Sequence, residues 1–149
     1  MIIRNNLALP SLFLRLTLGI SYLWFVADRL GFLGANGSPH VGWGDWRHLI
    51  QYASQVMSFL PSGVIPFFAI LATAGEFSFG FLLVIGCFTR VAALGSGLLS
   101  LMFAISMAIS FGIESPLGYS VFTVSAASFL LATIPSYRWS VDEWRSKKK

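Results

Sequence analysis

Four long apolar segments, separated by more polar links, dominate the hydrophobic pattern of this chain. They cover about residues 10–30, 64–86, 91–111 and 117–134. Each approaches the roughly 20 residues that a helix needs to cross about 30 Å of hydrocarbon. The second, third and fourth segments are joined by links of only a few residues, so neighbours are expected to be antiparallel. The pattern predicts one all-α membrane domain over residues 1–149, folded as a four-transmembrane-helix bundle.

The link between the first two segments, residues 31–63, is long and has a pattern of its own. Its first part is rich in Gly, Asn and Pro, which favour turns. From Asp45 to Leu60, apolar residues recur at helical spacing with polar residues between them, as in an amphipathic helix. Asp45 is well placed to cap the start of that helix. We therefore expect an extracytoplasmic cap, residues 31–63, that lies on the bundle and contains an amphipathic helix.

The composition agrees with a membrane location. Of the 149 residues, 56% are hydrophobic and only 11% are charged, whereas globular domains carry about 25% charged residues. Such a chain cannot hide its apolar surface in one small core. The net charge is +4, and the excess lies in the terminal stretch WRSKKK, residues 144–149. A basic run beside membrane spans indicates contact with anionic lipid headgroups, not nucleic-acid binding.

The distribution of Lys and Arg predicts the orientation. With four spans, both termini and the second link lie on one side, which carries seven basic residues: Arg4, Arg90, Arg138, Arg145, Lys147, Lys148 and Lys149. The other side carries two, Arg29 and Arg47. Because cytoplasmic segments carry the excess of positive charge, we expect both termini in the cytoplasm and the protein in the inner membrane. Arg90 is then a cytoplasmic anchor.

Two of the apolar segments contain charged residues. A carboxylate near mid-membrane, such as that of Glu76, costs about 2.5 kcal/mol or more on insertion scales. At 100° per residue, Glu76 shares one helical face with small residues, and the first segment has a similar stripe. The stripes are Ser11, Arg15, Gly19, Tyr22, Val26 and Arg29, and Ala69, Ala72, Glu76, Gly80, Leu83, Cys87 and Arg90.

Charges within spans face the bundle interior and find partners there, so we expect the two stripes to face each other. Arg15 is the predicted partner of Glu76. Two interpretations of the pair stay open: a structural pair that fixes helix register, or a polar pocket for a ligand or proton. The predicted pocket residues are Arg15, Gly19, Tyr22, Glu76 and Gly80.

A second group of polar residues is expected at the outer end of the first span. Asp28 is predicted to meet the loop there, with Arg47 or His48 as its partner. The predicted outer-end cluster is Asp28, Arg29, Asp45, Arg47 and His48.

The rest of the sequence favours no self-contained catalytic site. The one cysteine, Cys87, excludes an intrachain disulfide and a thiolate cluster. His40 and His48 lie eight residues apart, a poor spacing for a metal, so no metal or haem is predicted. A row of small residues in the third segment, including Ser96 and Ser100, is interpreted as a helix-packing face.

The two charged segments carry a family resemblance. LFLRLTLGISYLWFVADRLGFLG and AGEFSFGFLLVIGCFTRVAALGSGLL resemble the DoxX family of small four-helix membrane proteins. That family shows an Arg and a Gly four residues apart in the first span and a basic residue near its end. Its second span has a Glu and a Gly- and Leu-rich run, and Thr-Arg opens the third. The matching positions are Arg15, Gly19, Arg29, Glu76, Gly80, Gly86, Thr89 and Arg90.

The resemblance implies a function that the residues alone do not. The family includes proteins like the membrane subunit of thiosulfate:quinone oxidoreductase, and others that look like partners of soluble enzymes in oxidative-stress defence. The expected function is therefore a membrane subunit of a quinone-linked redox complex, not catalytic alone, with quinone as cofactor. Its expected partners are the lipid bilayer, a soluble redox enzyme subunit and other copies of itself. The alternatives are a non-enzymatic scaffold for soluble redox enzymes and, third, a small-molecule or lipid transporter.

Overall fold

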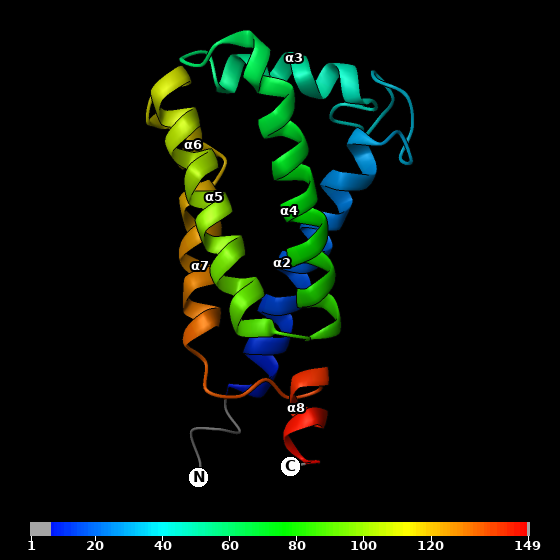
Figure 1. The fold of residues 1–149 in the computed structure, drawn as a ribbon, viewed down its shortest axis with the longest axis vertical. Coiled ribbons are helices and arrows are strands. Elements are labelled where there is room, and N and C mark those ends of the chain that lie inside the picture. Colours follow the sequence, from blue (N-terminus) through cyan, green and yellow to red (C-terminus); the bar gives the residue numbers. More distant parts are fainter. Residues whose placement is uncertain (1–6, 149) are drawn as a thin grey trace.

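The computed structural model describes residues 7–148, and the regular elements in that range are helices (Figure 1). Three of them are long and apolar enough to cross a membrane: α2 (Ala8–Arg29), α4 (Ile65–Ile85) and α5 (Thr89–Phe111). A 3₁₀ turn, η1 (Ser62–Val64), leads into α4. Large apolar side chains stay exposed on their outer faces, for example Phe13, Phe67 and Val91. These helices correspond to the first three predicted spans. Two basic residues used to predict the orientation, Arg4 and Lys149, lie outside the described residues.

The fourth predicted span, residues 117–134, is interrupted in the structure. A short helix, α6 (Glu114–Gly118), ends before Ser120, whose φ of 57° is left-handed. α7 (Val121–Thr133) then continues for 13 residues, about 20 Å at 1.5 Å per residue. That length is short of the hydrocarbon thickness. Four spanning helices are therefore not confirmed, because the left-handed residue divides the last apolar segment.

The long helices run along a common axis, with different caps at the two ends (Figure 1). α2 packs on α4, α4 on α5, and α5 on α7. At one end, α3 (Trp46–Val56) lies across the ends of the long helices, and at the other lie the α4–α5 turn and α8 (Val141–Ser146). We call these the α3 end and the α8 end.

α3 is the amphipathic helix predicted in the first loop. It is shorter than the predicted stretch from Asp45 to Leu60, because regular helix ends at Val56. Its buried residues, Leu49, Ala53 and Val56, form one face. Asp45 caps the helix as predicted: its side chain accepts a hydrogen bond from the backbone N–H of His48 at 2.8 Å. That bond holds the pKa of the Asp45 carboxyl below its ordinary value.

The two polar stripes face each other, as the sequence predicts. The backbones of α2 and α4 approach closely where Gly19 meets Gly80. A Cβ built on Gly19 would lie 2.8 Å from the carbonyl oxygen of Gly80, and one on Gly80 would lie 3.0 Å from that of Gly19. Small residues permit such contacts between membrane helices. This crossing sets the register that places the charged residues.

Candidate functional site

Glu76 pairs with Arg29 and not with the predicted partner, Arg15. Nη1 of Arg29 lies 2.7 Å from Oε2 of Glu76, and the side chains are only 4% and 6% exposed. Apart from this contact with Arg29, Oε2 has no hydrogen-bond partner. Arg29 also donates to Thr73 Oγ1 at 2.9 Å and to the Phe25 carbonyl at 3.1 Å. The pair is buried, and Arg29 has more polar partners than Glu76.

The direction of the side chains explains why Arg29 is the partner. Every Cα–Cβ bond in a helix tilts toward the helix N-terminus. The N-terminus of α2 lies at the α8 end, so the side chain of Arg29 reaches toward the middle of the bundle and that of Arg15 reaches toward the α8 end. α4 runs the other way, so Glu76 tilts toward the α3 end and meets Arg29. The hydrogen bond from Arg29 back to Phe25, one turn earlier, shows the same direction.

Arg15 lies at the α8 end, on the other side of the Gly19–Gly80 crossing. It is 2% exposed, and Nη2 donates to the Trp139 carbonyl at 2.9 Å. The predicted pocket of Arg15, Gly19, Tyr22, Glu76 and Gly80 is therefore divided. The two glycines separate Arg15 from the Glu76 region, which contains Tyr22.

Tyr22 begins a chain of buried hydroxyl groups that the sequence analysis did not predict. Its hydroxyl lies 2.6 Å from Ser100 Oγ and 2.9 Å from Ser96 Oγ, and Ser96 Oγ lies 3.0 Å from Ser128 Oγ. The chain thus connects α2 through α5 to α7. Glu76 interacts electrostatically with the Tyr22 hydroxyl. Ser96 and Ser100 belong to the row of small residues, so that face contributes hydrogen bonds as well as close packing.

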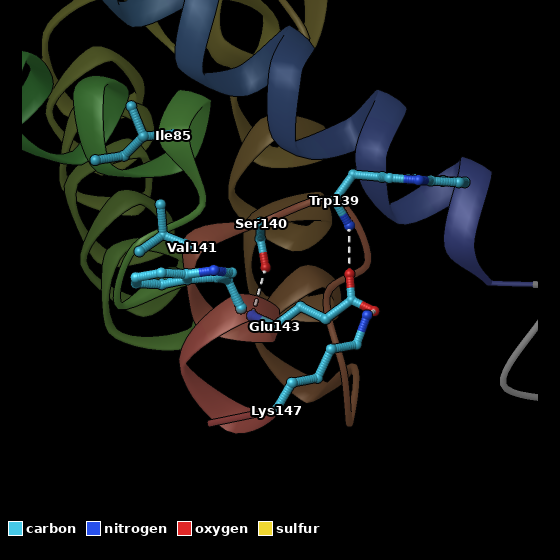
Figure 2. Close-up of a pocket in the computed structure, with 7 residues that line it drawn as sticks. Ile85, Trp139, Ser140, Val141, Glu143 and Lys147 are labelled. Carbon is cyan, nitrogen blue, oxygen red and sulfur yellow. Dashed lines mark hydrogen bonds and ion pairs between the residues drawn. The ribbon is translucent and has the colours of Figure 1, made fainter. Parts of the chain in front are cut away.

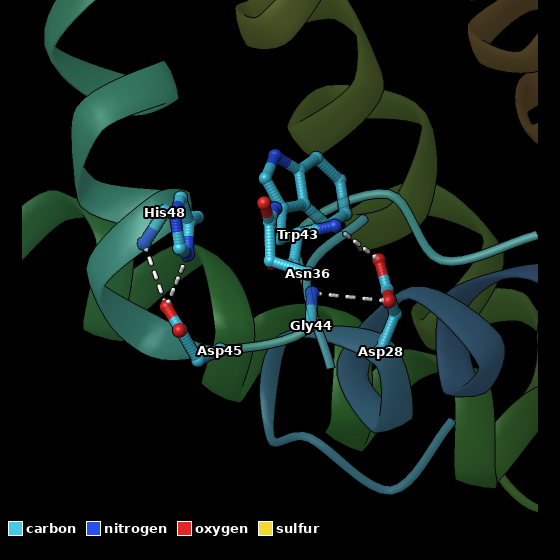
Figure 3. A network of polar contacts seen from close by, with 6 residues as sticks. All are labelled: Asp28, Asn36, Trp43, Gly44, Asp45 and His48. Atoms are coloured by element: carbon cyan, nitrogen blue, oxygen red, sulfur yellow. Dashed lines mark hydrogen bonds and ion pairs between the residues drawn. The ribbon is translucent and has the colours of Figure 1, made fainter. Parts of the chain in front are cut away.

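The predicted outer-end cluster exists only in part. Asp28 meets the loop, but through backbone amides: its carboxylate accepts from the N–H groups of Gly42, Trp43 and Gly44 at 3.1, 2.9 and 3.3 Å. Figure 3 shows the contacts with Trp43 and Gly44. The expected partner was Arg47 or His48. Glycine at position 42 allows this approach, because a Cβ there would lie 2.9 Å from Asp28 Oδ2.

Neither of these two side chains, Arg47 and His48, contacts Asp28. The His48 ring contacts Asp45, with Nδ1 2.9 Å from Oδ1 (Figure 3). Arg47 is exposed. The loop therefore binds Asp28 through its backbone and leaves these charged side chains at the surface of α3.

The loop also brings an aromatic cover to the Arg29–Glu76 pair. The Arg29 guanidinium carbon lies 5.1 Å from the centre of the Trp43 ring, within the range of a cation–π contact. The same ring packs against Phe25 at 5.9 Å and Tyr52 at 5.8 Å, centre to centre. Asp28 binds the backbone of Trp43, and its neighbour on α2, Arg29, lies against the ring of Trp43. Two adjacent residues of α2 therefore hold both the aromatic cover and the cation that it covers.

At the α8 end, the C-terminal segment is bound to the α4–α5 turn. Asp142 accepts hydrogen bonds from the backbone N–H groups of Phe88 and Thr89 at 2.9 and 2.8 Å. The Asp142 N–H donates to the Gly86 carbonyl at 3.0 Å. The predicted anchor Arg90 is exposed at the start of α5. An Asp that caps a helix from more than 50 residues away cannot be identified from local sequence.

Two open clefts flank this segment. One, of about 460 Å³, lies between Ile85 and α8 (Figure 2). Its Glu143 accepts a hydrogen bond from the Trp139 N–H at 2.8 Å and pairs with Lys147 at 3.1 Å, which lowers the pKa of the Glu143 carboxyl. The other cleft, of about 690 Å³, lies between the start of α5 and the segment from Pro135 to Lys147.

The described residues contain no group of three or more His, Cys, Asp or Glu side chains placed to hold a metal ion. Cys87 is buried as a free thiol. Comparison with protein-family models, curated proteins and solved structures gave no match to this chain. The resemblance to DoxX proteins therefore stays a prediction.

Proposed function

We propose that this protein is the membrane subunit of a quinone-linked redox complex, as its resemblance to the DoxX family implies. The observation that supports this most directly is the environment of Glu76. Its buried carboxylate is paired with Arg29 through Oε2, which has no further hydrogen-bond partner. The Tyr22 hydroxyl, the first of a chain of buried hydroxyl groups, interacts electrostatically with Glu76. Ionisable residues within spans often mark ligand and proton sites.

These residues fit the needs of a quinone. Quinone takes up two electrons and two protons on reduction, so its site requires hydrogen-bonding groups and a group that exchanges protons. In this chain Glu76 would hold or release a proton at Oε2, and Tyr22 would donate a hydrogen bond from its hydroxyl. Arg29, 2.7 Å from Oε2, would offset the charge of the carboxylate when it is ionised. We assign the electron donor to a soluble redox enzyme as partner, as the resemblance to the family implies.

The same proposal includes a topology. α6 and α7 together run from Glu114 to Thr133, and we propose that they form the fourth crossing despite the break at Ser120. The protein then lies in the inner membrane, with both termini in the cytoplasm. The α3 end faces outward, and the α8 end faces a cytoplasmic partner.

Binding of a quinone analogue tests the function. The purified protein in nanodiscs is titrated with decyl-ubiquinone and with a menaquinone analogue, and Trp fluorescence quenching is followed. We expect Glu76→Gln and Tyr22→Phe to weaken binding about tenfold or more, the effect of losing one hydrogen bond at a charged site. Tyr119→Phe is the matched control, because Tyr119 is 76% exposed. Equal binding by all four proteins, or none by the wild type, contradicts the proposal.

A second candidate, a scaffold for soluble enzymes, is favoured by the two clefts beside α8. They lie at the end expected to face the cytoplasm, and charged side chains line them. A stable soluble partner that copurifies while quinone analogues fail to bind would favour the scaffold over the redox subunit.

A further inference from the structure

Arg15 has hydrogen-bonding capacity that its own chain does not use. The side chain is 2% exposed, and only Nη2 has a partner, the Trp139 carbonyl. Nε and Nη1 are buried without a hydrogen-bond partner. Buried polar groups are nearly always bonded, and a guanidinium presents five donors in a fork that suits carboxylate and phosphate groups. The unused donors of Arg15 therefore indicate an anionic ligand.

The N-terminus of α5 lies close to Arg15 and already binds an anion. Each oxygen of the Asp142 carboxylate accepts one backbone N–H, from Phe88 or from Thr89. The start of a long helix favours such groups, because its free N–H groups carry partial positive charge. α5 has 23 residues. The Thr89 hydroxyl, fully buried beside these amides, has no partner.

Gly86 brings Arg15 and this helix terminus together. A Cβ at Gly86 would collide with the Arg15 guanidinium and with the Ser140 side chain. The Gly86 carbonyl accepts from the Asp142 N–H, and Asp142 is the acidic residue that interacts electrostatically with Arg15. Arg15, the start of α5 and the Asp142 carboxylate therefore meet around one turn.

A cleft reaches the start of α5 and the Asp142 side chain from outside, and Arg15 lies buried behind them. The cleft of about 690 Å³ is lined by Thr89 and Asp142. Its charged lining is more basic than acidic, with Arg90, Arg138 and Lys147 beside Asp142 and Glu143. A phosphate group would find complementary charge there and room to enter.

We propose that Arg15 and the N-terminus of α5 form a binding site for a phosphate group, which Asp142 occupies as a tethered substitute. A phosphate has the two oxygens that the amides of Phe88 and Thr89 require. Its further oxygens would accept from Nε and Nη1 of Arg15 and from the Thr89 hydroxyl. Binding displaces the Asp142 carboxylate and releases α8 from the α4–α5 turn. The phosphate comes from an anionic lipid headgroup of the adjacent leaflet or from free phosphate.

The test uses the full chain, purified and delipidated, in nanodiscs of phosphatidylcholine. One arm adds phosphatidic acid to the nanodiscs, the other adds inorganic phosphate, and native mass spectrometry reports bound lipid or phosphate. Hydrogen exchange of residues 139–146 reports the release of α8. Arg15→Gln removes the main cation, and Asp142→Asn weakens the tethered competitor. Arg47→Gln is the control, since Arg47 is exposed at the α3 end.

The two variants are expected to act in opposite directions. Arg15→Gln weakens binding about tenfold or more, and Asp142→Asn strengthens it by a similar factor, as expected for charged hydrogen bonds. Bound phosphatidic acid that inorganic phosphate does not displace assigns the site to lipid, and direct binding of inorganic phosphate assigns it to the free ion. The proposal is overturned if the wild type binds neither phosphatidic acid nor inorganic phosphate. It is also overturned if Asp142→Asn binds neither of them more tightly than the wild type does. If Arg15→Gln does not fold, the direction of the Asp142→Asn effect still decides.

Discussion

Removing either member of the Arg29–Glu76 pair should destabilise the protein, and the two losses should be unequal. Taking one partner from a buried ion pair costs about 3–5 kcal/mol, because the other charge is left uncompensated. In Glu76→Gln, Arg29 keeps Thr73, the Phe25 carbonyl and the Trp43 ring. We therefore expect Glu76→Gln to lower the free energy of unfolding by about 3 kcal/mol.

Arg29→Gln should cost more. It leaves the Glu76 carboxylate buried without its cation, and Oε2 has no other hydrogen-bond partner. It also removes the contact with the Trp43 ring, which is worth about 0.5–2 kcal/mol. We expect a loss of about 5 kcal/mol, at the upper end of the range for buried pairs. The double variant should be less damaged than the sum of the single variants, by about 0.5–3 kcal/mol.

Reversible unfolding in bicelles titrated with sodium dodecyl sulfate, followed by circular dichroism, measures these free energies. The matched control is the pair Arg15→Gln and Glu76→Gln. Those residues lie roughly 12 Å apart along the helix axis, on opposite sides of the glycine crossing, at 1.5 Å per residue. Their effects should add within about 0.5 kcal/mol. Coupling between Arg15 and Glu76, with additivity between Arg29 and Glu76, would refute the assignment of the pair.

Three further predictions concern the packing, the cap and the orientation. Gly19→Ala should lower the free energy of unfolding by about 1–3 kcal/mol through overpacking, because the added Cβ would meet the α4 backbone. In the same assay Gly118→Ala should not lower it, because a Cβ at Gly118 meets nothing within 4 Å. The carboxylate of Asp45 caps α3 and its pKa is lowered, so its stabilising effect is present above the ordinary Asp pKa and is lost as the pH falls through the lowered value. Protection of the backbone amides at the start of α3 against hydrogen exchange should therefore fall in acid. In Asp45→Ala, that protection should not depend on pH in this range. In a cysteine-free background, a cysteine at Ser38 should react with an impermeant reagent in intact cells and one at Ser146 should not, and the reverse pattern would contradict the orientation.

Regular periodicity made the helices and their interior faces predictable. The stripes on α2 and α4 follow from 3.6 residues per turn, and the glycines at positions 19 and 80 mark where the two backbones cross. The partner of Glu76 was mispredicted because only depth in the membrane was considered. Arg15 and Arg29 lie at comparable distances from Glu76 along the axis, and the tilt of the Cα–Cβ bonds decides between them.

Other features depend on contacts that no local pattern encodes. Asp28 binds three successive backbone amides, which requires the folded path of the loop. Asp142 caps α5 only after the C-terminal segment has turned back across Arg15. The break at Ser120 is a single left-handed residue in an otherwise apolar stretch, so hydropathy alone predicts a continuous span.

The two buried arginines of α2 differ in how far the fold satisfies them, and this makes the two proposed sites separable. Arg29 has a carboxylate, a hydroxyl, a carbonyl and an aromatic ring as partners, whereas Arg15 has one carbonyl. The Gly19–Gly80 crossing lies between them. Glu76→Gln should therefore weaken quinone-analogue binding and leave phosphate binding unchanged. Asp142→Asn should strengthen phosphate binding and leave quinone-analogue binding unchanged. If either variant altered both, the two ends of α2 would be coupled through the crossing, and the sites would have to be treated as one.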